Sequence, residues 1–210
     1  RLALYLVIGT IPAALVGAFL AEPLEAAFDR PVLVSVLLIV TGSILWGIRW
    51  IREGSRDEAS PGRAVLIGVA QAAAVLPGIS RSGATVSAGL GLGLKRREAA
   101  EFAFLLSVPI ILGATVVSFV EMSVERSLAE SLAAVNAVAA VAAGRIPEAI
   151  PTVSAVPTAA LVAGTAAAFA AALPAIFVLL RTVIDGKLHR FSYYCWAVGA
   201  VGIVAVLLRG

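Results

Sequence analysis

The hexapeptide SRSGAT at residues 80–85 concentrates side chains that are suited to binding an anion. The guanidinium of Arg81 is a planar fork of donors that can meet two phosphate oxygens at once. Ser80, Ser82 and Thr85 add hydroxyl donors beside it. If a helix begins near Ser82, its free N–H groups and the positive end of its dipole point into the same place. The pattern therefore predicts a site for a phosphate-bearing ligand, with Arg81 as its main contact.

Pro77 and Gly78 stand directly before this arginine and interrupt an apolar segment of 31 residues, residues 64–94. Proline removes a backbone donor and glycine tolerates turn geometry, so a helix is expected to break there. Arg81 is the only charge in the segment. An arginine in the middle of a bilayer is costly unless phosphate, carboxylate or water meets it. We therefore expect two half-helices that meet inside the membrane, with Arg81 binding an anion at the break.

Other roles for the same residues remain open at this point. An ion pair between Arg81 and Glu101 would also make the arginine tolerable. Capping of the second half-helix explains the serines and Thr85 nearly as well as ligand contact, and the two roles are compatible. His189, the only histidine, lies in a basic loop and is expected to be solvated rather than catalytic.

The composition is that of an integral membrane protein. The chain is 60% hydrophobic and 14% charged, whereas a soluble domain carries about 25% charge. Strand-period alternation is absent, so we expect an all-α polytopic bundle rather than a β-barrel. The net charge of +3 comes from basic residues in loops between apolar runs, which favours membrane orientation over nucleic-acid binding. The single cysteine excludes an internal disulfide.

The apolar runs predict one transmembrane domain over residues 1–210. Each run approaches the roughly 20 residues that a helix needs to cross a bilayer. Residues 64–94 are expected to form a re-entrant pair. Residues 121–157 are expected to form a surface helix and a proline-punctuated linker, because their charges make them a poor span. The expected spans are residues 2–21, 32–48, 102–120, 158–180 and 191–208.

Charge counting tests whether residues 64–94 cross the membrane. If the segment enters and leaves on one face, eleven basic residues lie on one side and four on the other, with Arg81 buried between them. If it crosses once, the split is eight against seven. The positive-inside rule favours the re-entrant arrangement and a cytoplasmic basic side. The first half-helix, residues 64–76, would also extend only about 20 Å, which is too short to cross.

Residues 71–114 closely resemble the second signature of the undecaprenyl-pyrophosphate phosphatase family, of the bacitracin-resistance type. That signature has Pro-Gly, a hydrophobic residue, Ser-Arg-Ser-Gly and a threonine two residues further on, as at residues 77–85. A Glu-Phe-x-Phe-Leu-Leu run and a proline follow. The matching residues here are Glu101, Phe102, Phe104, Leu105, Leu106 and Pro109.

The resemblance implies a fold of six spans and two re-entrant pairs, arranged as two inverted repeats of three spans each. This chain would supply five spans and one re-entrant pair. The family's first signature, a glutamate pair followed by Pro-x-Ser-Ser-x-Gly-His, is thought to supply the acid, base or nucleophile and does not occur here. We therefore expect an N-terminal part to precede Arg1. Gln71 stands where the inverted repeat implies a counterpart to one of those glutamates.

The reaction that the resemblance implies is hydrolysis of a polyprenyl diphosphate to the monophosphate, which recycles the lipid carrier for cell-wall or surface glycan synthesis. Arg81, with Ser80, Ser82 and Thr85, would stabilise charge on the phosphoryl oxygens. Five further residues are assigned to substrate binding. They are Pro77, Gly78, Gly83, Gln71 and Glu101.

The expected partners are the polyprenyl diphosphate, membrane lipids and a further copy of the chain, with no nucleic acid. The expected location is the plasma membrane, as a multi-pass protein. The resemblance also implies a divalent cation, Mg²⁺ or Ca²⁺, for which the sequence offers no ligand set. Two rival functions use the same site: transport or flipping of an anionic, phosphorylated lipid, and binding without hydrolysis.

Overall fold

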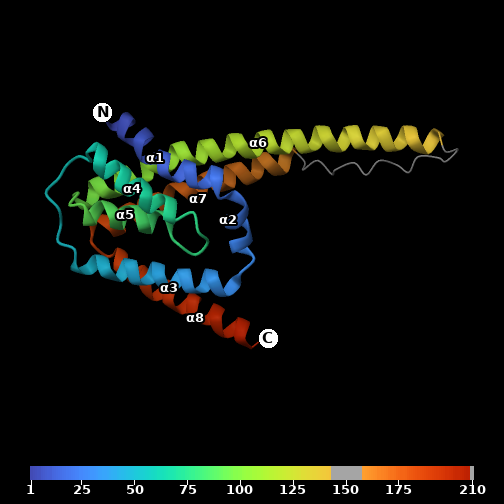
Figure 1. The fold of residues 1–210 in the computed structure, drawn as a ribbon. Coiled ribbons are helices and arrows are strands. Elements are labelled where there is room, and N and C mark those ends of the chain that lie inside the picture. The colour runs from blue at the N-terminus through green and yellow to red at the C-terminus, as the bar shows by residue number, and fades with distance from the viewer. Residues whose placement is uncertain (143–157, 209–210) are drawn as a thin grey trace. The chain divides into compact units, whose positions relative to one another are not determined.

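The computed structural model describes residues 1–142 and 158–208, and this part of the chain is almost entirely helical (Figure 1). Ten helical elements follow one another there, two of them single 3₁₀ turns. In chain order they are α1 (Leu2–Phe19), α2 (Ala21–Phe28), α3 (Pro31–Gly47), η1 (Ile48–Trp50), α4 (Pro61–Ala73), α5 (Arg81–Gly91), α6 (Arg96–Ala142), α7 (Thr158–Ile184), η2 (Leu188–Arg190) and α8 (Phe191–Leu207).

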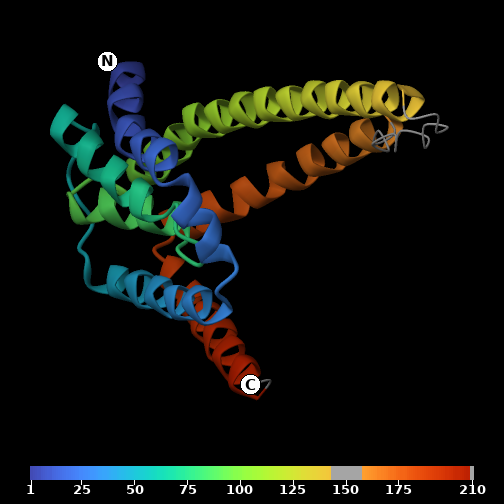
Figure 2. The same cartoon turned by 45° about the vertical axis from the view of Figure 1, so that its right-hand side comes forward.

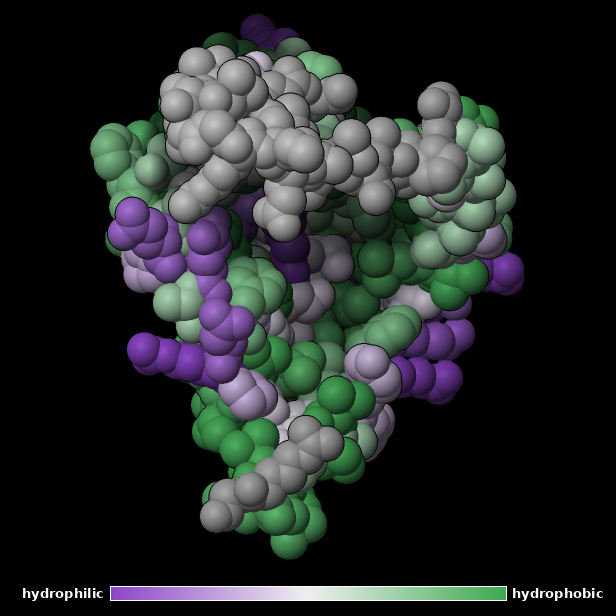
Figure 3. Space-filling view, turned by 90° about the vertical axis from the view of Figure 1, so that its right-hand side faces the viewer, coloured by the Kyte–Doolittle hydropathy of each residue, from purple (hydrophilic) through white to green (hydrophobic). Residues whose placement is uncertain are grey.

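Within the described ranges, five stretches are long and apolar enough to cross a membrane. They are Leu2–Phe19, Pro31–Trp50, Arg96–Val124, Ala159–Ile184 and Leu188–Leu207. Many of their leucine, valine and phenylalanine side chains are exposed, as lipid-facing side chains would be. In the space-filling view, hydrophobic surface surrounds the C-terminal end of α8, and hydrophilic side chains gather in separate clusters (Figure 3). The predicted all-α, polytopic fold class is confirmed.

The structure differs from the expected boundaries at two places. The first span ends at Phe19 rather than at residue 21, and the short helix α2 follows it. The larger difference is α6, which continues for 47 residues from Arg96 to Ala142. Residues 121–142 are therefore part of this helix and not a separate surface helix. The remainder of the expected linker, residues 143–157, lies outside the described residues.

The continuity of α6 has a local cause. Helix formation depends on backbone hydrogen bonds to the residue four positions earlier, and alanine, leucine and glutamate all favour it. The charges at Glu121 and beyond affect whether this part of the helix can lie in a bilayer, but they do not end the helix. Pro109 lies inside α6, and the helix passes through it.

The chain divides into two units. The first contains Arg1–Ile110 and Ala175–Gly210, and the second contains Ile111–Pro174. The second unit consists of the later part of α6 and the earlier part of α7, and its described side chains are exposed. In the first unit, α3 packs along α8, α1 packs along α4, and α5 packs against both α4 and α3 (Figure 2). The candidate site lies in this first unit.

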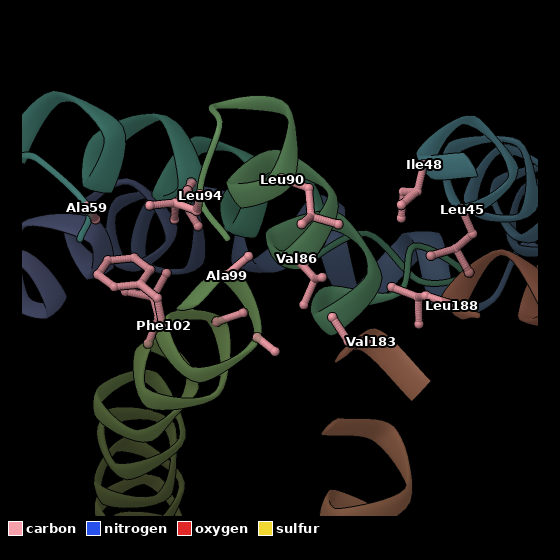
Figure 4. Close-up of a cluster of buried hydrophobic side chains, with 14 of the residues drawn as sticks. Leu45, Ile48, Ala59, Val86, Leu90, Leu94, Ala99, Phe102, Val183 and Leu188 are labelled. Atoms are coloured by element: carbon pink, nitrogen blue, oxygen red, sulfur yellow. The ribbon is translucent and has the colours of Figure 1, made fainter. Parts of the chain in front are cut away.

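The core of the first unit forms around α5. Val86 and Leu90 on α5 are buried together with Leu45 on α3, Phe102 on α6 and Val183 on α7 (Figure 4). Because α5 contributes to this core from the middle of the unit, its N-terminus is held at a fixed position among the surrounding helices.

The two ends of the α4–α5 pair are held together by the backbone. Before α4, the N–H of Arg56 donates to the carbonyl of Gly93 at 3.2 Å, and the N–H of Lys95 donates to the carbonyl of Arg56 at 3.0 Å. The ammonium of Lys95 also pairs with the carboxylate of Asp57. The chain thus returns after α5 to the place from which it entered α4, as a re-entrant segment requires.

Candidate functional site

The turn between α4 and α5 depends on Gly78. Its φ angle is +97°, a backbone conformation that glycine adopts without strain. It also lies against α3: a Cβ atom built at this position would overlap the carbonyl oxygen of Val34 and stand 3.0 Å from the Cβ of Leu37. Pro77, next to it, is buried. The helix therefore breaks where the sequence predicted, and the turn is pressed against a neighbouring helix.

Thr41 on α3 fixes this turn from outside. Its hydroxyl donates to the carbonyl of Gly78 at 2.9 Å and accepts from the backbone N–H of Ser80 at 3.2 Å. The threonine is 3% exposed. Sequence reasoning did not select Thr41, because it lies 37 residues before Gly78 and no local spacing connects the two.

The N-terminus of α5 is capped by Ser80, whose hydroxyl oxygen accepts from the N–H of Gly83 at 3.1 Å. This confirms the predicted capping role of Ser80. The proton of the Ser80 hydroxyl has no acceptor among the described residues. The same holds for the backbone N–H groups of Arg81 and Ser82 and for the Ser82 hydroxyl. The helix start thus presents several uncommitted donors to one place.

The guanidinium of Arg81 is exposed, and no carboxylate in the described part of the chain pairs with it. Glu101 instead accepts from the Nε of Arg97, four residues earlier on α6, at 2.7 Å. The alternative in which Arg81 is held in an ion pair with Glu101 is therefore wrong. No side-chain hydrogen bond from the Arg81 fork, which carries five N–H donors, is found to the described residues.

Two of the predicted contacts are engaged or enclosed elsewhere. Thr85 is 1% exposed, and its hydroxyl donates to the carbonyl of Arg81 at 2.9 Å, so its only proton is used within its own helix. Gln71 on α4 is fully buried, and neither its amide oxygen nor its amide nitrogen has a hydrogen-bond partner among the described residues. Neither side chain lines the pocket that opens beside the start of α5.

A pocket of about 440 Å³ opens beside the start of α5. The backbone of the turn and the side chains of Ser80 and Ser82 form its polar end, together with buried Gly83. The rest of its lining is nearly all apolar and comes from α3, α5, α7, η2 and α8. Glu101 lines a different pocket, beside Tyr5 and Asp57. Its assignment to substrate binding stays a prediction that this arrangement does not favour.

The described residues do not form a binding site for a divalent cation. Mg²⁺ and Ca²⁺ prefer carboxylate and carbonyl oxygens. Among residues 1–142 and 158–208, no three histidine, cysteine, aspartate or glutamate side chains come together as a metal site would require. No carboxylate lines the pocket at the α5 start either. The cation that the resemblance implies stays a prediction.

These features define a polytopic α-helical membrane protein with an anion-suited helix start at a break between two short helices. Comparison with known proteins gives the family. The family described as "Bacitracin resistance protein BacA" matches residues 1–201, and the chain belongs to that family.

Curated relatives agree over nearly the whole chain. A protein of Desulforapulum autotrophicum called undecaprenyl-diphosphatase is 37% identical over 207 residues, which cover 98% of this chain and 65% of the relative. Relatives of the same name from Methanothermobacter thermautotrophicus and Korarchaeum cryptofilum are 36% and 34% identical over 207 residues each. The alignment covers 99% of the first of these and 67% of the second. The chain thus spans about two thirds of the length of the Desulforapulum and Korarchaeum relatives and nearly the whole length of the Methanothermobacter relative.

Proposed function

We propose that this protein hydrolyses a polyprenyl diphosphate of the undecaprenyl type to the monophosphate and inorganic phosphate. Membership of the BacA family supports this proposal, as do the relatives called undecaprenyl-diphosphatase. The observation that carries it is the start of α5, where N–H and hydroxyl donors with no partner among the described residues lie at the polar end of an apolar pocket. The exposed side chain of Arg81 belongs to the same helix start but is not part of the pocket lining.

Hydrolysis breaks the bond between the bridging oxygen and the terminal phosphorus while the oxygen of a water molecule bonds to that phosphorus. Negative charge spreads over the phosphoryl oxygens and the leaving bridging oxygen. Arg81 would take two of those oxygens in its fork. The N–H groups of Arg81 and Ser82 and the Ser82 hydroxyl would meet a third. Fixed donors in a water-poor site stabilise such charge strongly, because they need no rearrangement during the reaction.

The residues that line the pocket bind and polarise the diphosphate, but they do not take the proton from water. The lining contains no carboxylate and no histidine. His189 is not among those residues, and its Nδ1 lies 3.2 Å from the carbonyl of Gly186. That His189 is non-catalytic stays a prediction.

We propose a location in the plasma membrane with the basic loops on the cytoplasmic side. The hydrogen bonds between Arg56 and residues 93–95 support the placing of both hairpin ends on one face. The excess of basic residues on that face supports its orientation. Cysteines introduced at Arg52 and Arg97, in a Cys195→Ala background, should label from the same side. Labelling from opposite sides would contradict the re-entrant arrangement.

Phosphate release from farnesyl diphosphate by the purified gene product in liposomes tests the activity. A flippase or a binding protein would release none. Arg81→Ala should lower kcat/KM by about 100-fold or more, the usual effect of removing a donor to developing charge. Arg81→Lys keeps the charge and loses the fork, and we expect about a tenfold loss. Arg52→Lys, at an exposed arginine outside the pocket, is the matched control.

A further inference from the structure

Four aromatic side chains form a cluster where the end of α3 and η1 meet the start of α8. Trp46 lies at its centre, and its ring centroid is 5.5 Å from those of Tyr193 and Trp196 and 6.4 Å from that of Trp50. Trp50 and Tyr193 are more than half exposed. Exposed tryptophan and tyrosine in a membrane protein favour the level of the lipid headgroups, where ring and polar tip are both accommodated. This aromatic cluster therefore indicates where the two helices reach the membrane surface.

Arg49 is stacked on the aromatic cluster. Its Cζ atom lies 4.4 Å from the ring centroid of Trp46 and 5.3 Å from that of Trp50, both inside the roughly 6 Å over which a cation and an aromatic face attract each other. Stacking uses the flat face of the guanidinium and leaves the N–H donors at its edge free to bind. The side chain is exposed, and no carboxylate in the described part of the chain pairs with it.

The acidic residues near this arginine pair with other cations. The carboxylate of Glu53 lies 3.9 Å from the Nε of Arg96, and that of Asp185 accepts from the Nζ of Lys187 at 3.0 Å. The turn η2, which lies beside η1, adds the exposed cation Arg190. The surface around the aromatic cluster therefore carries positive charge that suits an anion.

From these contacts we propose that Arg49 and the aromatic cluster bind the headgroup phosphate of an anionic phospholipid, with phosphatidylglycerol as the simplest case. The inference goes beyond the proposed function and does not depend on it. The guanidinium fork can take two phosphate oxygens at once, while the exposed rings cover the glycerol and the upper part of the acyl chains. Basic side chains at a membrane surface attract anionic lipids in this way.

This lipid site is separate from the donors at the start of α5. Thr41, which binds the turn at Gly78, precedes Arg49 by eight residues, or about 12 Å along the helix axis. Arg49 is not part of the pocket lining beside α5. Its position is nevertheless fixed, because Ile48 on η1 and Leu188 on η2 are buried in the core of the first unit (Figure 4).

Tryptophan fluorescence tests the proposal directly, because all three tryptophans of the chain belong to the aromatic cluster. The purified gene product is placed in phosphatidylcholine vesicles that contain an equal small fraction of either phosphatidylglycerol or phosphatidylcholine with brominated acyl chains, which quench nearby tryptophan. We expect the association constant for phosphatidylglycerol to exceed that for phosphatidylcholine by about fivefold, the size typical of one basic residue at an anionic surface. Arg49→Gln should reduce this preference to less than about twofold.

The matched control is Arg52→Gln, at an exposed arginine in the loop after η1 for which no aromatic contact is found among the described residues. It should keep most of the preference. Equal losses in the two variants would mean a diffuse effect of surface charge and would overturn the site, as would a wild-type protein with no preference. Arg49→Lys keeps the charge but loses the planar fork, so it should lose most of the preference. Full retention in that variant would contradict binding by the stacked fork.

Two further measurements identify the anion. Arg81→Ala should leave the lipid preference unchanged, even if the protein proved to release no phosphate. If this variant lost the preference, the lipid would be bound at the start of α5 and the proposal would fail. Inorganic phosphate should weaken the preference no more than chloride does at the same ionic strength. Stronger displacement by phosphate would mean that Arg49 binds a free anion rather than a lipid headgroup, and would also refute the proposal.

Discussion

Thr41 on α3 binds both flanks of the turn that ends at α5, donating to the carbonyl of Gly78 at 2.9 Å and accepting from the N–H of Ser80 at 3.2 Å. One hydroxyl therefore holds the carbonyl before the helix start and the amide of its capping residue. The position of the donors at the start of α5 depends on this contact between two helices that lie far apart in sequence.

Replacing Thr41 with valine should reduce both stability and activity. The shape is kept, but two backbone groups in a largely buried place lose their partner, at a cost of about 1–3 kcal/mol. We expect a lower thermal unfolding midpoint and a fall in kcat for farnesyl diphosphate, both measured in detergent. Thr41→Ser should recover most of each. The control is Thr165→Val, whose exposed hydroxyl bonds only to the carbonyl of Leu161 in its own helix. An active, fully stable Thr41→Val variant would exclude the bridging role.

Gly78→Ala should be strongly disruptive. The residue has φ +97°, where an L side chain costs about 1–2 kcal/mol, and its new Cβ would also overlap the carbonyl of Val34 on α3. We expect loss of phosphate release together with a lower unfolding midpoint. Gly91→Ala, at the last residue of α5, is the matched control because a Cβ there meets nothing within 4 Å. If the two variants had the same activity and unfolding midpoint, the tight turn against α3 would be needed for neither.

Much of this site can be predicted from the sequence because its signals are local. Pro77 and Gly78 mark the break, and Ser80 stands in capping register with Gly83. The contact between Arg97 and Glu101 was equally accessible, since an i,i+4 pair on a helix is a local pattern. The family resemblance instead assigned Glu101 to substrate binding, whereas in the structure its carboxylate pairs with Arg97.

What could not be predicted depends on tertiary packing. The bridging hydroxyl of Thr41 and the burial of Thr85 follow from how α3 and α5 meet, and no spacing in the chain encodes that meeting. The length of α6 differs from the prediction for another reason. Its charges were interpreted as the end of a span, whereas backbone geometry and helix propensity allow the same helix to continue.

Substitution of Gln71 tests whether its buried amide has a structural or a functional role. Its amide is fully buried and has no hydrogen-bond partner among the described residues, an arrangement that costs about 1–3 kcal/mol. Gln71→Met keeps the shape and removes the penalty, so the unfolding midpoint should rise or stay unchanged. If the amide serves the reaction, kcat/KM should fall by about tenfold in the same variant, because a polar contact in the site is lost.

The control for Gln71→Met is Ile67→Met on the same helix, where a buried apolar side chain is replaced by one of similar volume. It should leave activity unchanged and cost less than about 1.5 kcal/mol. A Gln71→Met variant that is destabilised while Ile67→Met is not would show that the amide has a stabilising partner, contrary to this expectation.

The pair between Asp57 and Lys95 should make the closure of the hairpin ends sensitive to alkaline pH. Hydrogen bonding to Asp57, and then its negative charge, raise the pKa of Lys95 above its ordinary value of 10.5. A raised pKa means that the folded state holds this proton more tightly than the unfolded state does. The stabilisation is therefore fully present below 10.5 and is lost as the pH rises through the higher folded value.

Asp57→Asn removes the partner, so the difference in unfolding midpoint between wild type and variant should be small and constant from about pH 7 to about pH 10 and should disappear at higher pH. The difference is small because both side chains are largely exposed and solvent screens the pair. Thermal unfolding in detergent at several pH values measures it. Asp29→Asn, at an exposed aspartate after α2, is the control, because no ion pair is found for it among the described residues. A wild-type advantage that persisted undiminished at the highest pH would mean that Asp57 stabilises the hairpin without the charge of Lys95. No wild-type advantage at any pH would mean that the backbone hydrogen bonds of Arg56, rather than the ion pair, close the hairpin.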